Sequence, residues 1–148
     1  MPARIQTEDF DIAAEIAALS AGRDDIGAVV TFTGLVRGGD ITSLTLEHYP
    51  GMTERALAEI AAEANARWPL KASLIVHRVG TLKPGERIVL VVTASESRQA
   101  AFDAANFLMD YLKTDAPFWK REEKVDGTAA WVDAREGDTS ARDRWKQP

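Results

Sequence analysis

Four cationic side chains stand where the local sequence would bring positive charge to an anionic ligand. Arg37 lies in a glycine-rich loop, directly after a run of β-branched residues. Arg98 begins a strongly apolar helical segment, and the free backbone N–H groups at the start of a helix attract anions. Lys113 ends the same segment, and Lys120 follows in the motif PFWKRE. Arginine and lysine bind phosphate and carboxylate groups, so these positions predict an anion-binding site.

Each of these cations also has an explanation that involves no ligand. The helix dipole favours a lysine in the last turn of a helix, which accounts for Lys113. Arg37 can be a solvated loop residue, and the alternating charges of 120–124 can be the outer face of a hairpin. The glycine-rich loop matches neither the Walker nor the Rossmann pattern. Spacing alone therefore indicates a possible anion site and names no reaction.

The other reactive residue types are scarce. There is no cysteine, which excludes disulfides, thiolate metal sites and cysteine nucleophiles. Only His48 and His77 could supply imidazole, and no HExxH-type spacing is present, so no metal ion and no cofactor are expected. Both histidines are interpreted as strand-end or structural residues. Ser95 and Ser97 have no Ser-His-Asp context and are candidate N-caps for the helix that follows.

Length and composition restrict the class of protein. The 148 residues, with 45% hydrophobic residues, suit one compact domain. A formal net charge of −5 argues against a nucleic-acid-binding protein, because phosphate backbones favour basic surfaces. No apolar run approaches the roughly 18 residues that a membrane span needs, and the N-terminus lacks the apolar stretch of a secretory signal. A cytoplasmic location is the resulting prediction.

Hydrophobic periodicity predicts the elements that must position the cations. Thr53 is the expected N-cap of the second of three helices. The third helix carries two adjacent apolar stripes, so most of its surface should be buried. The predicted helices span residues 11–19, 53–67 and 98–113, and the predicted strands span 27–33, 41–48, 73–79, 87–93, 118–125 and 128–132.

Short turns between consecutive strands predict an antiparallel arrangement. The segment 83–86 (KPGE) is a natural turn, and Asp126-Gly127 is a strong hairpin signal. Strand pairs joined by turns, with helices between them, favour the α+β class. No repeat or linker divides the chain, so residues 1–148 are predicted to form one domain. Residues 136–148 are predicted to be its polar tail, anchored by Trp145.

Five segments follow one another in an order typical of one enzyme family. They are 27–37 (GAVVTFTGLVR), 44–53 (LTLEHYPGMT), 76–80 (VHRVG), 95–102 (SESRQAAF) and 109–122 (MDYLKTDAPFWKRE). The blocks LEHYPGMT and DYLKT-x-APFWKRE are the most specific. On these segments, which cover most of the chain from about Asp25 to Glu136, it resembles the large, catalytic subunits of molybdopterin synthase.

The resemblance implies a fold, a reaction and partners. The expected fold is an α/β-hammerhead with an additional antiparallel β subdomain. The expected assembly is a homodimer that binds a small ubiquitin-like sulfur-carrier subunit at each end, giving a heterotetramer. The carrier's Gly-Gly tail, which ends in a thiocarboxylate, would enter a pocket of this chain. There it would transfer two sulfurs to precursor Z (cyclic pyranopterin monophosphate) and form the dithiolene of molybdopterin.

The family's functional positions map onto named residues of this sequence. Lys113 and Lys120 match the catalytic lysines, which also contact substrate. Arg98 and the residue before it match a pterin-phosphate pair expected to come from the opposite protomer. The remaining substrate-binding positions are Leu35, Val36, Arg37, Arg121 and Glu122.

Two departures from the family pattern bear on this expectation. The family commonly has histidine where this chain has Ser97, so a titratable imidazole is missing from the phosphate site. The loop between Arg37 and Thr45 is shorter than in familiar members, which predicts altered loop dynamics rather than lost activity. Ser97 also lends some support to another hypothesis, a dimeric module that binds a ubiquitin-like tail without sulfur chemistry. A third, a small anion- or nucleotide-binding domain, rests only on the glycine loop and the cations.

Overall fold

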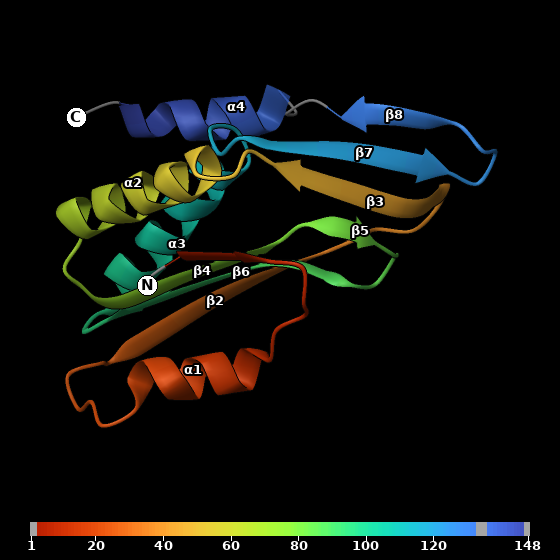
Figure 1. Cartoon of the computed structure of the whole chain (residues 1–148). Coiled ribbons are helices and arrows are strands. Elements are labelled where there is room, and N and C mark those ends of the chain that lie inside the picture. The colour runs from red at the N-terminus through yellow and green to blue at the C-terminus, as the bar shows by residue number, and fades with distance from the viewer. Residues whose placement is uncertain (1–2, 133–135, 147–148) are drawn as a thin grey trace.

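The protein combines two four-stranded sheets with helices in an α+β arrangement, as the computed structural model shows (Figure 1). Residues 3–132 and 136–146 are described. The helices are α1 (Ile12–Ser20), α2 (Met52–Arg67), α3 (Arg98–Leu112) and α4 (Glu136–Asp143), followed by a 3₁₀ turn, η1 (Arg144–Lys146). The strands are β1 (Ala3–Gln6), β2 (Ala28–Leu35), β3 (Ile41–His48), β4 (Leu70–Arg78), β5 (Gly80–Leu82), β6 (Arg87–Ser95), β7 (Phe118–Lys124) and β8 (Ala129–Val132).

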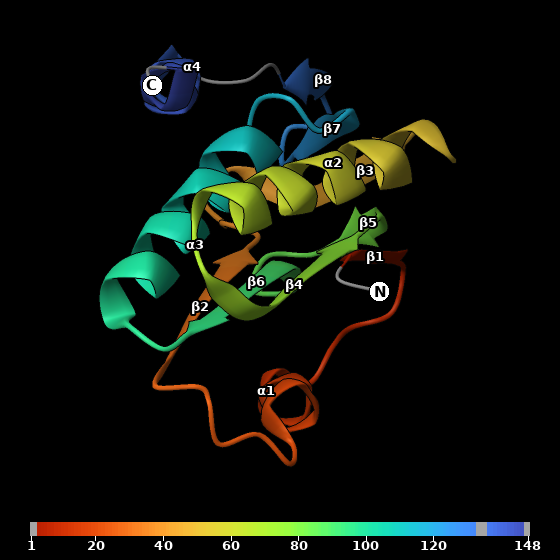
Figure 2. The same ribbon diagram turned by 90° about the vertical axis from the view of Figure 1, so that its left-hand side faces the viewer.

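The first sheet has the strand order β1-β4-β6-β2 and is covered on both faces. Helices α2 and α3 lie over one face, and α1 lies against the other (Figure 2). Successive residues of a strand point to opposite faces, and β4 follows this rule with Ile75 under α2 and α3 and with Leu74 and Val76 on the α1 side. A strand buried on both faces reads as a continuous apolar run, as β6 does over residues 88–92 and β4 over residues 74–76.

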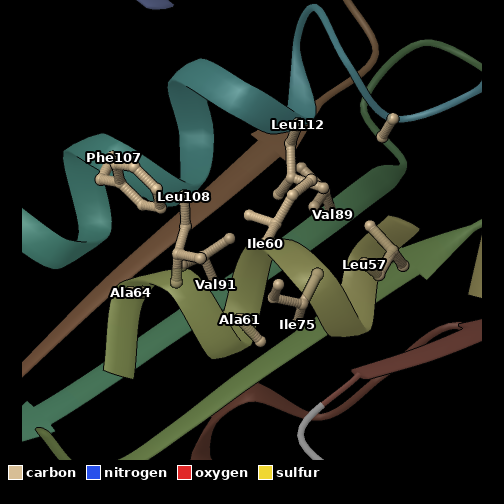
Figure 3. Packing of buried hydrophobic residues seen from close by; sticks show 11 residues of the cluster. Leu57, Ile60, Ala61, Ala64, Ile75, Val89, Val91, Phe107, Leu108 and Leu112 are labelled. Carbon is tan, nitrogen blue, oxygen red and sulfur yellow. The ribbon is translucent and has the colours of Figure 1, made fainter. Parts of the chain in front are cut away.

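The largest core cluster lies between α2, α3 and this sheet (Figure 3). Leu57 and Ile60 of α2 meet Leu108 and Leu112 of α3 above Val91 of β6. Leu57 and Leu108 have no exposed surface. Burial of each such side chain stabilises the fold by about 1.5–3 kcal/mol, and together these contacts fix the far end of α3 relative to the sheet.

The second sheet has the order β5-β3-β7-β8 and is antiparallel throughout. A small cluster of Val36, Leu46 and Leu82 packs beneath it. The hairpin predicted at Asp126-Gly127 joins β7 to β8 and is confirmed, as is the predicted antiparallel pairing of β4 with β6. The α+β class, with an added antiparallel sheet, is therefore confirmed.

The structure corrects the predicted start of α2. The helix begins at Met52 and its N-cap is Gly51, whose backbone N–H donates to the carboxylate of Glu54. Thr53 was predicted to be the N-cap, but it lies within the first turn with its side chain fully buried. Gly51 has φ of +85°, which a β-branched residue would adopt only with strain, so the turn requires glycine where the chain enters the helix.

Four elements, β1, β5, α4 and η1, lie outside the sequence predictions. β1 pairs in parallel with β4, and β5 adds to the second sheet; both are too short to give a periodic signal. Residues 136–146 of the predicted polar tail form α4 and η1, which lie beside α3 (Figure 1). The predicted anchor is confirmed: the Trp145 ring packs edge-on against Trp68 and Phe107, and its Nε1–H donates to Asp110 at 2.6 Å.

Two further observations concern the surface. The third helix was predicted to be buried on most of its surface, yet Phe102 of α3 is 53% exposed, so the helix is less buried than its composition predicts. Within residues 3–132 and 136–146, no helix is long and apolar enough to cross a membrane.

Candidate active site

A cavity of about 710 Å³ opens where the two sheets and the end of α3 meet. Its wall combines the end of β2 and the loop after it with β3, the C-terminal turn of α3 and β7. Six of the residues predicted for the site line this cavity, namely Leu35, Val36, Arg37, Lys113, Lys120 and Glu122. The remaining lining residues are Phe32, Thr33, Gly34, Ile41, Leu44, His77, Ile88, Leu112, Thr114, Ala116, Phe118, Trp119 and Val132.

The end of β2 places Arg37 at the cavity. A register irregularity at Gly34 and Leu35 interrupts the β2–β6 ladder, and beyond it the backbone of Val36 exchanges hydrogen bonds with the turn at Gly85 and Glu86. The Val36 side chain is buried in the cluster beneath the second sheet. Arg37, next in the chain, is exposed and lines the cavity.

Lys113 is held at the C-cap of α3. Its backbone N–H donates to Met109, and the next three N–H groups converge on the carbonyl of Tyr111 at 3.2, 2.7 and 3.3 Å. The chain therefore turns sharply after the helix, and Pro117 follows where the helix cannot continue. An ammonium at this position also lies at the negative end of the helix dipole.

Lys120 reaches the same cavity from β7. It pairs with Leu46 of β3 and Val132 of β8, so its backbone position is set by strands on both sides. Alternation along the strand puts Glu122 on the same face, while Arg121 points to the other face. The two lysines, predicted from a helix end and a strand, thus meet at one cavity.

Arg121 occupies a different environment from Lys120. Its guanidinium donates to Glu123 at 3.0 Å and lies 5.9 Å from the centre of the Trp131 ring. Its Nε is the one buried side-chain nitrogen or oxygen without a partner among the described residues. Arg121 does not line the cavity, so its predicted role in the site stays a prediction.

Ser97 and Arg98 lie at the other end of α3. Ser97 is the N-cap, as predicted, and its hydroxyl accepts from the N–H of Ala100 at 3.4 Å. The 15 residues of α3 separate this end from Lys113. At 1.5 Å per residue, the helix is about 22 Å long. Neither residue lines the cavity of its own chain, and the expectation that they reach the opposite protomer's cavity stays a prediction.

His77 is a cavity residue that the sequence reasoning interpreted only as structural. Its imidazole stacks on Phe118, with ring centres 3.8 Å apart and planes at 16°, and its Nδ1 bonds the Arg78 carbonyl at 2.9 Å. Burial, with a smaller contribution from the nearby charges of Lys120 and Lys113, lowers the pKa of His77 to about 3. His77 is therefore neutral at physiological pH. Strand alternation could have indicated that His77 points inward, because it lies two residues after Ile75, on the face of β4 that α2 and α3 cover.

The cavity can bind an anion together with a flat apolar group. Arg37, Lys113 and Lys120 supply positive charge against the single carboxylate of Glu122, and the rings of Phe118 and Trp119 supply apolar area. Ammonium and guanidinium groups both bind and stabilise developing negative charge. Among the described residues, no group of histidine and carboxylate side chains is arranged to hold a metal ion.

Comparison with known proteins identifies the family. The family model described as MoaE protein matches residues 5–115, which include the end of β2, His77 and Lys113. The chain belongs to the MoaE family. Among its relatives, the molybdopterin synthase catalytic subunit of Mesorhizobium japonicum is 61% identical, over 97% of this chain and 92% of the relative. The one of Pseudomonas aeruginosa is 54% identical, over 99% and 100%.

Solved structures agree with this membership. The molybdopterin biosynthesis MoaE protein of Burkholderia ambifaria is 53% identical and superposes with a TM-score of 0.85, over 99% of this chain and 98% of that one. The molybdopterin synthase of Staphylococcus aureus is 32% identical with a TM-score of 0.79, over 86% and 94%. Membership places the chain among the catalytic subunits of molybdopterin synthase, which act in molybdenum cofactor biosynthesis.

Proposed function

We propose that this chain transfers sulfur from the thiocarboxylate of a small carrier protein to a cyclic pyranopterin monophosphate and so forms the molybdopterin dithiolene. The observation that carries the proposal is the meeting of Lys113 and Lys120, from different elements, at one cavity that also holds Arg37. A chain without cysteine cannot carry a persulfide, so the sulfur has to arrive on a partner.

The carrier's tail and the substrate bring two negative groups into the cavity. The three cations offset their mutual repulsion, and arginine can hold a phosphate with two hydrogen bonds. A thiocarboxylate is already an anionic nucleophile, so it needs positioning and shielding from water rather than a base. Positioning is supported by the elements of fixed register that carry the cations.

The two lysines take separate roles in this mechanism. The carrier's sulfur attacks a carbon of the pterin side chain. The C–S bond forms while a bond from that carbon to oxygen breaks, the oxygen leaving through ring opening or as water, and the carrier stays attached through a thioester. Water then adds to the thioester carbonyl, the carbonyl–sulfur bond breaks, and the carrier leaves as a carboxylate with the sulfur on the pterin. Lys113 would stabilise the tetrahedral oxyanion, a contribution of about 3 kcal/mol. Lys120 would move the proton during ring opening and loss of water, and a second carrier repeats the transfer.

We further propose a homodimer in which each protomer completes the other's site and each end binds one carrier, giving a heterotetramer. β2 is an edge strand of the first sheet and exposes Val29, Phe32 and Leu35. Two β2 edges paired antiparallel about a two-fold axis would bring the start of one strand to the end of the other. Ala28 pairs with Ser95, just before α3, so the partner's Arg98 would approach this chain's Arg37.

The experiment that tests the function is an anaerobic reconstitution of this protein, the pterin substrate and a thiocarboxylated carrier. Dithiolene-containing product that forms only with all three components supports the proposal. A carrier that ends in an ordinary carboxylate is the matched control and should give none. Carrier binding without product would favour the tail-binding module instead, and restoring histidine at Ser97 would then be the next variant.

A further inference from the structure

The segment between the two lysines, residues 114–119, runs from the loop after α3 into the start of β7. Two residues that the proposed mechanism does not use hold this segment. Its first half folds back on the end of α3 through the Tyr111 carbonyl. Its second half touches two other elements: the Thr53 hydroxyl donates to the Pro117 carbonyl at 3.1 Å, and the His77 ring stacks on Phe118. The last residue of the loop and the first residue of β7 are thus fixed from α2 and from β4.

Thr53 is fully buried, and its hydroxyl makes two hydrogen bonds. It accepts from the N–H of Tyr49 at 2.9 Å while it donates to Pro117. The Thr53 N–H also bonds the Tyr49 carbonyl at 2.9 Å. A buried hydroxyl that satisfies both a donor and an acceptor has one orientation, so it joins the turn before α2 rigidly to the loop. The hydrogen bond from Thr53 to Pro117 thereby links the two sequence blocks that are most specific to the family, LEHYPGMT and DYLKTDAPFWKRE.

His77 holds the next residue by ring contact. The ring is 6% exposed, and its Nδ1 is bonded to a backbone carbonyl of its own strand, so its plane cannot turn freely. Phe118 lies flat on this plane, two residues before Lys120. Since Phe118 also pairs with His48 in the β3–β7 ladder, the start of β7 is fixed in direction as well as in register.

We propose that Thr53 and His77 are positioning residues, which fix Pro117 and Phe118 and thereby set the relative placement of Lys113 and Lys120. The expected effect on the rate of turnover rests on the proposed sulfur transfer. The expected effect on the placement of the two lysines does not. Neither side chain donates or accepts a proton in the reaction. A displacement of about 1 Å between catalytic groups can cost up to a hundredfold in rate, so a small shift of this loop is enough to matter.

The main test compares Thr53→Val with Thr53→Ser and with Thr93→Val. Thr93 is the matched control, because it too is fully buried and donates its hydroxyl to a backbone carbonyl, that of Ala101 at 2.7 Å. Thr53→Val should lower kcat by about tenfold or more and leave KM within about twofold. Thr53→Ser keeps the hydroxyl and should restore the rate, while Thr93→Val should lose thermal stability without losing kcat. Equal kcat in Thr53→Val and Thr93→Val would overturn the proposal.

A second measurement separates this proposal from the proposed function. Acylation rates of single lysines, followed by mass spectrometry with Lys71 and Lys83 as internal references, report the surroundings of Lys113 and Lys120 without turnover. Thr53→Val should change the rates at both lysines, and Thr93→Val should change neither. If the wild-type protein made no molybdopterin while these rates still shifted, the function would fail and the positioning role would stand. Unshifted rates in a protein that turns over would remove the positioning role alone.

A further pair of variants applies if Thr53→Val does not fold. His77→Phe keeps a flat ring against Phe118, whereas His77→Asn keeps a donor near the position of Nδ1 and loses the stack. Retained kcat in His77→Phe with a loss of about tenfold in His77→Asn supports positioning by the ring. Loss of kcat in folded His77→Phe, or wild-type kcat in both variants, overturns it.

Discussion

The His77 imidazole lies flat against the Phe118 ring, with 3.8 Å between ring centres, although the two residues are far apart in the sequence. The contact joins the end of β4 in the first sheet to the start of β7 in the second. The cavity lies at this junction, and both lysines are carried by the chain on either side of Phe118. The site therefore depends on how the two sheets are joined as much as on the cations themselves.

Lys113→Ala should lose nearly all turnover in a protein that stays folded and still binds its carrier. Removal of an oxyanion-stabilising group costs about 3 kcal/mol, or about a hundredfold in rate. Lys124→Ala is the matched control, because Lys124 is a hairpin lysine that pairs with Asp40 outside the cavity. The assay is single-turnover product formation, with carrier affinity measured in parallel. Wild-type turnover in Lys113→Ala would remove this residue from the mechanism.

Arg98→Ala should mainly raise the pterin concentration needed for turnover. If the partner supplies Arg98, a dimer with Lys113→Ala in one protomer and Arg98→Ala in the other contains one site with both residues intact. At a pterin concentration too low for Arg98→Ala alone to turn over, statistical mixing of the two variants should then recover about a quarter of wild-type activity, because half the dimers are mixed and half of their sites are whole. Mixtures that stay as inactive as the separate variants would show that both residues act in one chain.

Stability should fall with acidity through His77. Its folded pKa of about 3 lies below the ordinary value of 6.5, so the unfolded chain takes up a proton in a range where the folded protein does not. The stabilisation is complete above about pH 6.5 and is lost as the pH falls towards 3. Between about pH 7 and about pH 5, wild type should lose about 2 kcal/mol more unfolding free energy than His77→Phe. Urea unfolding at the two pH values measures this difference, and parallel losses would contradict it.

Gly27→Ala should destabilise the fold although Gly27 sits at an exposed strand end. A Cβ at this position would lie well inside van der Waals contact of the Glu96 carbonyl oxygen, and the Gly27 N–H is bonded to Ser95 at 2.9 Å. The backbone has to shift, which should cost about 1–3 kcal/mol. At Gly38 an added Cβ meets only Pro84, at an ordinary 3.6 Å, so Gly38→Ala should be nearly neutral. Thermal unfolding of the two variants compares them directly, and equal midpoints would show that the backbone relaxes without cost.

The sequence by itself determined the local structure that periodicity and turn chemistry encode. The strand at 41–48 was predicted with its observed bounds. The helix predicted at 98–113 ends at residue 112 in the structure, and Ser97 is its N-cap as predicted. The family blocks, read position by position, also named the cations that line the cavity. The strand, the helix and its cap depend on neighbours within a few residues, which a linear pattern contains, whereas the cations were named through the resemblance to the family.

Tertiary structure alone decided the contacts between distant segments. Thr53 was predicted to cap α2, because a threonine before an apolar run satisfies that local rule, but the fold buries it and gives its hydroxyl to Pro117. His77 was interpreted as structural, and only the stacking of Phe118 and the approach of both lysines make it part of the cavity. Lys120 and Arg121 are adjacent and alike in charge, yet the two faces of β7 place one in the cavity and the other beside Trp131. The physical reason is common to all three, because burial and hydrogen-bond partners are set by which elements pack together, and no local pattern contains that information.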